Sequence, residues 1–133
     1  MIWNQNMSVG VDVLDADHKK LVAMINDLYD GIAAGHGTER LGKVLNGLVD
    51  YTNFHFRREE EFFAQTEYPA LAEHTQKHRN LTSQVLDIQA RYNNGLLYAL
   101  SLDTMNFLRG WLTDHIQGSD KKYGPHLNAC GIF

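Results

Sequence analysis

The sequence predicts an all-α protein, an up-down-up-down antiparallel four-helix bundle with an extended N-terminal arm and a short C-terminal helical tail. The first observation is that apolar residues recur at i, i+3, i+4 and i+7 in four stretches. The second is that only short segments separate these stretches, and short connections make consecutive helices antiparallel. We expect one domain over residues 1–133, with the arm at 1–16, the bundle at 17–117 and the tail at 118–133.

The N-terminal arm and the first helix differ in periodicity. Valines alternate at positions 9, 11 and 13, which favours an extended segment packed over the domain. The first helix is expected to begin at Asp17 and to end before Gly35 and Gly37, because glycine commonly terminates helices. Its predicted buried stripe is Leu21, Val22, Ile25, Leu28, Tyr29 and Ile32.

The second and third helices carry histidines within their apolar stripes. Thr38 is suited to cap the second helix, which is expected to end near Phe63. Pro69 is suited to the first turn of the third helix, which is expected to stop near Asn94. The two stripes are Leu41, Val44, Leu45, Leu48, Tyr51 or Thr52, His55 and Glu59, and then Leu71, His74, His78, Leu81, Val85 and Ile88.

The fourth helix is expected to open near Ser101 and to be disturbed at Gly118, before the short tail. His115 and Asp120 are five residues apart, which on a regular α-helix turns them roughly 140° away from each other. A local π-type bulge or kink at Gly118 would return Asp120 to the face of His115, and such bulges are common at functional sites.

The composition is that of a soluble globular protein, with 44% hydrophobic and 21% charged residues. The net charge is -4 and no Lys/Arg cluster is larger than a pair, so we expect neither nucleic-acid binding nor membrane insertion. The lone Cys130 cannot form an internal disulfide, and the N-terminus lacks the basic and apolar regions of a secretory signal. We therefore expect a cytoplasmic monomer whose partner is a small molecule.

Five of the seven histidines form a pattern with two acidic residues. His55 and Glu59 are four residues apart, as are His74 and His78, so each pair lies on one helical face. For any single pair, an exposed helix face is as good an explanation as a metal chelate. Both pairs, however, follow the apolar stripe of their helix, where an unsatisfied imidazole or carboxylate costs about 1–3 kcal/mol. The predicted metal ligands are His18, His55, Glu59, His74, His78, His115 and Asp120.

This ligand set favours a pair of metal ions. Imidazole and carboxylate without thiolate suit iron, zinc, copper or nickel, and one tetrahedral zinc would leave several of these side chains unsatisfied. Of the roughly twelve positions on two six-coordinate ions, five imidazoles, two bridging carboxylates and a shared oxo or hydroxo group leave about one open. The open position predicts a site for a small ligand.

Over nearly its whole length the sequence resembles the hemerythrin family, and within it the stand-alone bacterial members. The resemblance rests on the ligand positions in order, on Trp3-Asn4 and the Ser8–Val11 segment, and on the block from Trp111 to Ile116. It implies two iron ions (Fe2+ or Fe3+) with a bridging oxo or hydroxo group. It also implies reversible O2 binding rather than catalysis, for oxygen transport, storage or local supply to an oxygen-consuming client enzyme.

The resemblance also implies a role for each ligand. One iron would be held by His74, His78 and His115, the other by His18 and His55, and both would be bridged by Glu59 and Asp120. The open position would then lie on the second iron. Five apolar residues are expected to line it, either as an O2 pocket or as ordinary core, two roles that are compatible. They are Val22, Phe56, Trp111, Leu112 and Ile116.

The sequence leaves the role of Asp17 and the choice among several functions undecided. The family commonly has Gln just before the first ligand, where this chain has Asp17, which would either cap the helix or contact a ligand. His36 and His126 are expected to be exposed, and Cys130 to have no redox role. Alternative functions are a di-iron peroxidase or NO-handling enzyme, and an iron-storage or O2-sensing module. Carboxylate-rich oxidases of the bundle class use Glu-x-x-His motifs, which are missing from these ligand positions.

Overall fold

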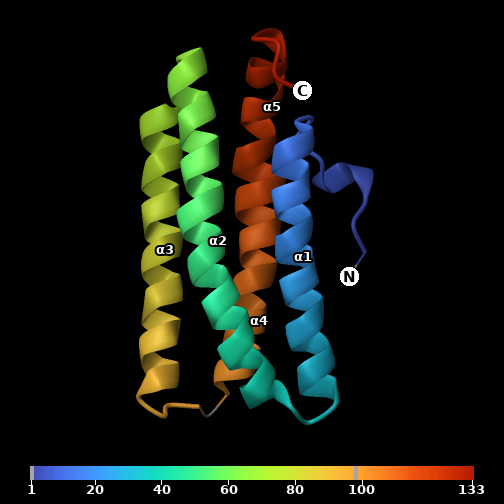
Figure 1. Cartoon of the computed structure of the whole chain (residues 1–133), viewed down its shortest axis with the longest axis vertical. Helices are drawn as coiled ribbons and strands as arrows, with labels where there is room; N and C mark the ends of the chain where they lie inside the picture. Colours follow the sequence, from blue (N-terminus) through green and yellow to red (C-terminus); the bar gives the residue numbers. More distant parts are fainter. Residues whose placement is uncertain (1, 98) are drawn as a thin grey trace.

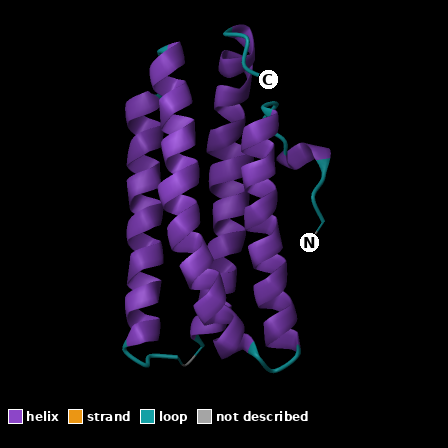
Figure 2. Cartoon of the chain, in the orientation of Figure 1, coloured by secondary structure: helices purple, strands orange, loops and turns teal. Residues whose placement is uncertain are grey.

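The computed structural model of the chain describes residues 2–97 and 99–133. The described residues form helices and no strands, arranged as four long rods, each antiparallel to the one before it in the sequence (Figures 1 and 2). The first three rods are single helices, and the fourth consists of three helical segments in direct succession. The elements are α1 (Asp12–Ala33), α2 (Gly37–Thr66), α3 (Leu71–Asn93), α4 (Leu100–Gly110), η2 (Trp111–Asp120) and α5 (Lys121–Ala129). The predicted four-helix bundle is confirmed.

Tight turns follow the first three rods near the expected places, but the predictions for Thr38 and Pro69 were wrong, because Thr38 lies inside α2 and Pro69 precedes α3. Gly35 after α1 and Gly95 after α3 have φ angles of 78° and 76°, a left-handed conformation that glycine adopts without steric cost. The turn after α2 instead places Glu67 in this conformation, with φ 53°, and its backbone N–H donates to the carbonyl of Phe63. These short connections hold neighbouring rods side by side, which brings distant parts of the sequence together.

Two apolar clusters fill the interior. The larger contains most of the apolar residues of the three predicted stripes, together with Leu100, Met105, Leu108, Trp111, Leu112 and Ile116 of the fourth rod. Tyr29, which was predicted to be buried, is exposed. The smaller lies where the N-terminal segment meets the C-terminal end of the fourth rod, and consists of Val9, Val11, Leu14, Phe63, Tyr123 and Leu127. Along α2 the larger cluster ends at Phe56 and the smaller begins at Phe63, and along the fourth rod the corresponding residues are Ile116 and Tyr123. The predicted ligands Glu59 and Asp120 therefore lie between the two clusters.

The N-terminal arm is shorter and more structured than predicted. It contains one 3-10 turn, η1 (Gln5–Met7), and α1 begins at Asp12 rather than at Asp17. Asp12 and Asp15 occupy the first turn of α1, where negative charge is favourable to the helix dipole. The Asp15 carboxylate also accepts a hydrogen bond from the backbone N–H of Val9 at 2.8 Å, which ties the arm to the helix start.

The predicted disturbance of the fourth helix at Gly118 is confirmed, but it does not separate the tail from the rod. The chain departs from α geometry there, but as a π-helix of 10 residues, η2, and helical structure then continues to Ala129. Tyr123 and Leu127 explain the continuation, because both are buried in the smaller cluster and extend the apolar face of the rod. Most of the segment expected to be a tail is thus part of the fourth rod.

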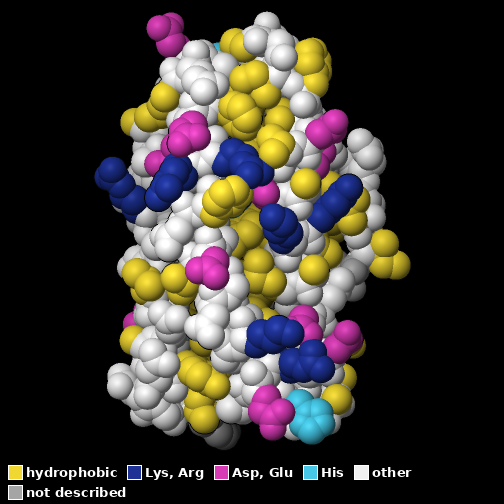
Figure 3. All heavy atoms as spheres, in the orientation of Figure 1, with side chains coloured by type: hydrophobic (Ala, Val, Ile, Leu, Met, Phe, Trp, Pro, Cys, Tyr) yellow, Lys and Arg dark blue, Asp and Glu magenta, His cyan; other side chains and the backbone are white. Residues whose placement is uncertain are grey.

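The molecular surface is mixed in character. On the face shown in Figure 3, basic and acidic side chains are interspersed with apolar ones, without a large patch of a single charge. Among the described residues, no helix combines the length and the hydrophobicity needed to cross a bilayer.

Candidate metal centre

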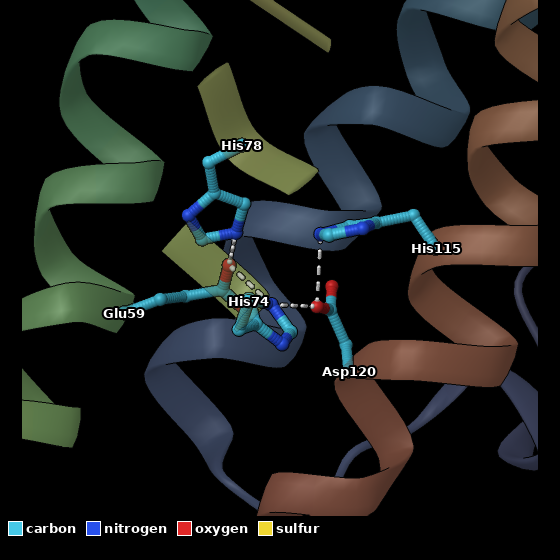
Figure 4. Close-up of side chains that lie close together, drawn as sticks. All are labelled: Glu59, His74, His78, His115 and Asp120. Atoms are coloured by element: carbon cyan, nitrogen blue, oxygen red, sulfur yellow. Dashed lines mark ion pairs between the residues drawn. The ribbon is translucent and has the colours of Figure 1, made fainter. Parts of the chain in front are cut away.

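The seven predicted ligands converge from all four rods. His18 comes from α1, His55 and Glu59 from α2, His74 and His78 from α3, and His115 and Asp120 from η2. All seven are buried, and none is more than 5% exposed. Figure 4 shows the side chains of five of them pointing toward a common centre, with Glu59 and Asp120 on opposite sides of it.

The ligand atoms fall into two groups that share both carboxylates. One group is Glu59, His74, His78, His115 and Asp120, and the other is His18, His55, Glu59 and Asp120. Within each group, all the donor atoms lie within 4.8 Å of one another. Two metal-sized sites that share two carboxylates are the arrangement expected of a bridged pair.

Asp120 divides its two oxygens between the groups. Its Oδ1 atom lies 2.8 Å from His74 Nε2 and 3.1 Å from His115 Nε2, whereas its Oδ2 atom lies 3.1 Å from His18 Nε2. Glu59 Oε1 lies 3.0 Å from His78 Nε2 and 3.3 Å from His55 Nε2, so one oxygen reaches both groups. Both carboxylates therefore stand where they can bridge.

The π-helix explains how Asp120 reaches the site. An α-helix turns residues five apart away from each other, whereas the i to i+5 repeat of a π-helix brings them to one face. His115 and Asp120 both lie within η2, and the Asp120 carboxylate consequently meets the His115 ring. Gly118 lies between them and its Cα is open, with only the Thr113 carbonyl 3.8 Å from an added Cβ.

Several buried polar atoms of the site lack hydrogen-bond partners, as expected where side chains are placed to bind a metal ion. Six such atoms of the described residues are Glu59 Oε1, His74 Nε2, His78 Nε2, His115 Nε2 and both Asp120 carboxylate oxygens. Each unsatisfied buried atom costs about 1–3 kcal/mol. Divalent first-row metals bind imidazole nitrogen and carboxylate oxygen, so the residues fit a metal pair, and binding would satisfy these atoms together.

Two of the imidazoles, those of His55 and His78, also contact carboxylates outside the cluster. They do so through Nδ1, on the ring edge opposite the Nε2 atom that points into the cluster. His55 Nδ1 donates to Asp17 Oδ2 at 2.9 Å, and His78 Nδ1 donates to Glu60 Oε2 at 3.2 Å. Such contacts orient a metal-binding histidine and fix which ring nitrogen carries the proton. One of the two shared carboxylates has an outer contact as well, because the Tyr123 hydroxyl donates to Glu59 Oε2.

The electrostatics of the metal-free cluster keep both carboxylates ionised. Burial by itself raises the pKa of Glu59 and Asp120, but His55 beside Glu59 and His115 beside Asp120 outweigh it and hold each pKa well below its usual range. For His55, burial lowers the pKa, but the charge of Glu59 and the hydrogen bond to Asp17 raise it to about 9. Burial and the Glu59 charge raise the pKa of Tyr123, so its hydroxyl stays protonated and donates.

The apolar residues predicted to line the small-ligand site are all buried in the larger cluster. The Phe56 ring stacks on His78 with ring centres 3.9 Å apart, and Trp111 lies 5.6 Å from Phe56. Val22, Leu112 and Ile116 are 4%, 3% and 0% exposed.

Other sequence-based expectations had mixed outcomes. Asp17 does not cap a helix, because α1 begins five residues earlier. It contacts the predicted ligand His55 instead, which was the other role considered for it. His36 is exposed as predicted, but the prediction for His126 was wrong. Its ring is half-buried, and Nε2 donates to the Thr66 carbonyl at 2.9 Å.

Two outer contacts were missed by sequence reasoning, those of Glu60 and Tyr123. Tyr123 lies three residues after Asp120 and hence on the same side of the rod, a spacing that could have indicated this contact. Glu60 carried no usable signal, because its partner His78 belongs to a different helix.

Two buried groups of histidines that share two carboxylates inside a four-helix bundle are typical of a class of non-haem metalloproteins. Comparison with known proteins identifies the family within this class. The model of the hemerythrin HHE cation-binding domain matches residues 9–127, so the chain belongs to the hemerythrin family.

Relatives in the family match nearly the whole of this chain. A bacteriohemerythrin of Methylococcus capsulatus is 35% identical over 130 residues, which cover 97% of this chain and 98% of the relative. A bacteriohemerythrin of Stenotrophomonas maltophilia is 32% identical, with 97% of this chain and 82% of the relative covered. The crystal structure of a wild-type hemerythrin superposes with a TM-score of 0.83 at 34% identity, covering 96% of this chain and 97% of that chain.

Proposed function

We propose that the chain binds two iron ions and uses them to bind O2 reversibly, as a carrier, a store or a local supplier for an oxygen-consuming enzyme. The observation that carries this proposal is the pair of donor groups that share Glu59 and Asp120 and leave buried donor atoms unsatisfied. Membership of the hemerythrin family supports iron as the metal. We propose a cytoplasmic monomer without catalytic residues.

The two donor groups suggest how the ions would be held. His74, His78 and His115 would bind one iron, and His18 and His55 the other. Glu59 and Asp120 would bridge them together with an oxo or hydroxo group, which leaves the open position on the iron of His18 and His55. When bound, the iron pair supplies the electrons that allow O2 to be taken up and released.

The remaining residues would control access and water. Val22, Phe56, Trp111, Leu112 and Ile116 would form an apolar pocket wall that admits O2 and excludes water. The Asp17 and Glu60 carboxylates would hold the Nδ1 protons of His55 and His78, so that Nε2 of each ring is free to bind metal. Imidazoles outnumber carboxylates in this set, which favours ferrous iron and binding over oxidative catalysis.

An optical titration tests the proposal. The iron-loaded protein is fully reduced, titrated with O2, and then deoxygenated under argon through repeated cycles. The proposal predicts a saturable spectral change that reverses on deoxygenation. Irreversible oxidation in the first cycle, or turnover of added peroxide or NO under conditions where O2 does not bind, would favour the enzymatic alternative instead.

A further inference from the structure

The outer contact of His55 differs from a simple hydrogen bond because a third residue takes part. Asp17 is 2% exposed and lies on α1, whereas His55 and Arg58 lie one turn apart on α2. The Asp17 carboxylate accepts from His55 Nδ1 at 2.9 Å, and Arg58 Nη1 donates to both of its oxygens at 3.1 Å. One carboxylate thus joins a predicted metal ligand to a fixed positive charge.

The two nitrogens of the His55 ring have different surroundings. Nδ1 faces Asp17, and Nε2 faces the cluster, 3.1 Å from His18 Nε2 and 3.3 Å from Glu59 Oε1. Because an ionised carboxylate only accepts hydrogen bonds, the proton of a neutral His55 ring resides on Nδ1 and the lone pair on Nε2 points at the metal position. Asp17 is therefore a positioning residue for His55.

The charges of Asp17 and Arg58 also affect the relative stability of the oxidised and reduced metal. A buried carboxylate close to a metal ligand stabilises the more positive, oxidised state of the metal, and a cation on that carboxylate opposes this stabilisation. Arg58 is partly buried, with 27% of its side chain exposed, and its guanidinium also lies 4.5 Å from the Phe54 ring centre. These contacts hold the positive charge in place. Lys20 is also cationic, but it lies 3.9 Å from Asp17 and its side chain is 66% exposed.

We infer that Asp17 and Arg58 act as a matched pair of opposite charges that positions His55 and sets the reduction potential of the iron bound through His18 and His55. This inference rests on the proposed di-iron site and assigns the control of its potential to two residues outside the ligand set. Asp17 lowers the potential and strengthens the imidazole donor. Arg58 raises the potential and holds the Asp17 carboxylate in place.

Variants at these positions are practical because the site borders open space. A cavity of about 240 Å³ between α1 and α2 is lined by Asp17, Lys20, Tyr51 and His55, among others. A shortened side chain at position 17 therefore meets a cavity that already exists rather than creating a void in close-packed core. Arg58 lies toward the surface, so its replacement keeps the test available if changes at Asp17 impair folding.

The test compares four variants of the iron-loaded protein: Asp17→Asn, Asp17→Ala, Arg58→Gln and Lys20→Gln. Midpoint potentials are measured by redox titration, and ferrous affinity is measured by competition with a chelator. Asp17→Asn removes the charge but keeps an oxygen that accepts from Nδ1, so we expect a raised potential with little loss of affinity. Asp17→Ala also removes the acceptor, and we expect affinity to fall by roughly 10–100-fold.

Arg58→Gln is the decisive variant, because the inference predicts a lowered potential, opposite in sign to the change in Asp17→Asn. The matched control Lys20→Gln removes an exposed cation near the same carboxylate, and we expect a much smaller shift. Shifts of the same sign in Asp17→Asn and Arg58→Gln, or equal shifts in Arg58→Gln and Lys20→Gln, would overturn the inference. If wild-type protein takes up no iron pair, the proposed function itself fails, and metal analysis distinguishes that result from unshifted potentials in fully loaded variants.

Discussion

Replacing His78 with alanine separates the structural role of a ligand from its metal-binding role. His78 is 2% exposed, stacks on Phe56 with ring centres 3.9 Å apart, and donates from Nδ1 to Glu60. Loss of the aromatic contact costs about 0.5–1.5 kcal/mol and loss of a hydrogen bond to a charged group about 1.5–3 kcal/mol. The metal-free protein should therefore lose on the order of 2–4 kcal/mol of unfolding free energy.

The metal-loaded protein should lose more. A ligand present at about 1,000 times its dissociation constant stabilises the native state by about 4 kcal/mol, and most of this is lost if His78→Ala abolishes binding at one site. Urea unfolding of wild type and variant, each with iron and after chelation, measures both contributions. The difference between the two proteins should be larger with iron than without it.

Two other histidines serve as controls for this experiment. His36→Ala should change neither iron content nor stability, because His36 is exposed. His126→Ala removes a hydrogen bond to the Thr66 carbonyl, so it should cost about 1 kcal/mol without loss of iron. Equal iron loss in His78→Ala and either control, or full iron content in His78→Ala, would refute the ligand assignment.

Three further predictions concern water, pH and the bridging carboxylate. Ile116→Glu, if it folds and loads iron, should become irreversibly diferric in air faster than the exposed control Lys20→Glu, as followed by stopped-flow absorption; equal rates would refute the water-excluding wall. The native pKa of His55 in metal-free protein is raised to about 9, so the stability it contributes is complete below pH 6.5 and is lost as the pH rises through 9. Chelated protein should then lose on the order of 3 kcal/mol between these values in urea unfolding, and constant stability would contradict the prediction. Tyr123→Phe leaves Glu59 Oε2 without its donor and should lower the unfolding free energy of the chelated protein by about 1–3 kcal/mol, and with it the melting temperature. An unchanged melting temperature would show that the contact contributes nothing.

Local sequence patterns predicted the helices and most of the residues that converge in the candidate site. The pairs His55/Glu59 and His74/His78 lie on single helices, so their spacing was sufficient to place both members on one face. The five-residue spacing of His115 and Asp120 correctly indicated π geometry, because no regular α-helix brings such residues together.

The errors arose where local signals competed. Asp17 was a plausible start for the first helix, but Asp12 and Asp15 offered the same favourable charge five and two residues earlier. Gly118 was expected to separate the fourth helix from a short helical tail, but the buried residues Tyr123 and Leu127 continue the apolar face, and their packing outweighs the glycine.

The outer contacts of the site could not be predicted, because they join residues distant in the sequence. Asp17 and His55 are 38 residues apart, and Glu59 and Tyr123 are 64 apart. Such pairs depend on how the rods are rotated and shifted against each other. Helical periodicity defines which face is buried, but not which side chain on a neighbouring helix it meets.

The stoichiometry of O2 uptake tests the paired metal centre most directly. Iron, protein and O2 are quantified on one reduced, fully loaded sample of the chain. If the two donor groups that share Glu59 and Asp120 hold a pair of ions with one open position, the protein contains about two iron atoms per chain and takes up about one O2 for each pair, all of it released on deoxygenation. A single zinc or iron per chain, or uptake of one O2 for each iron, would contradict this account.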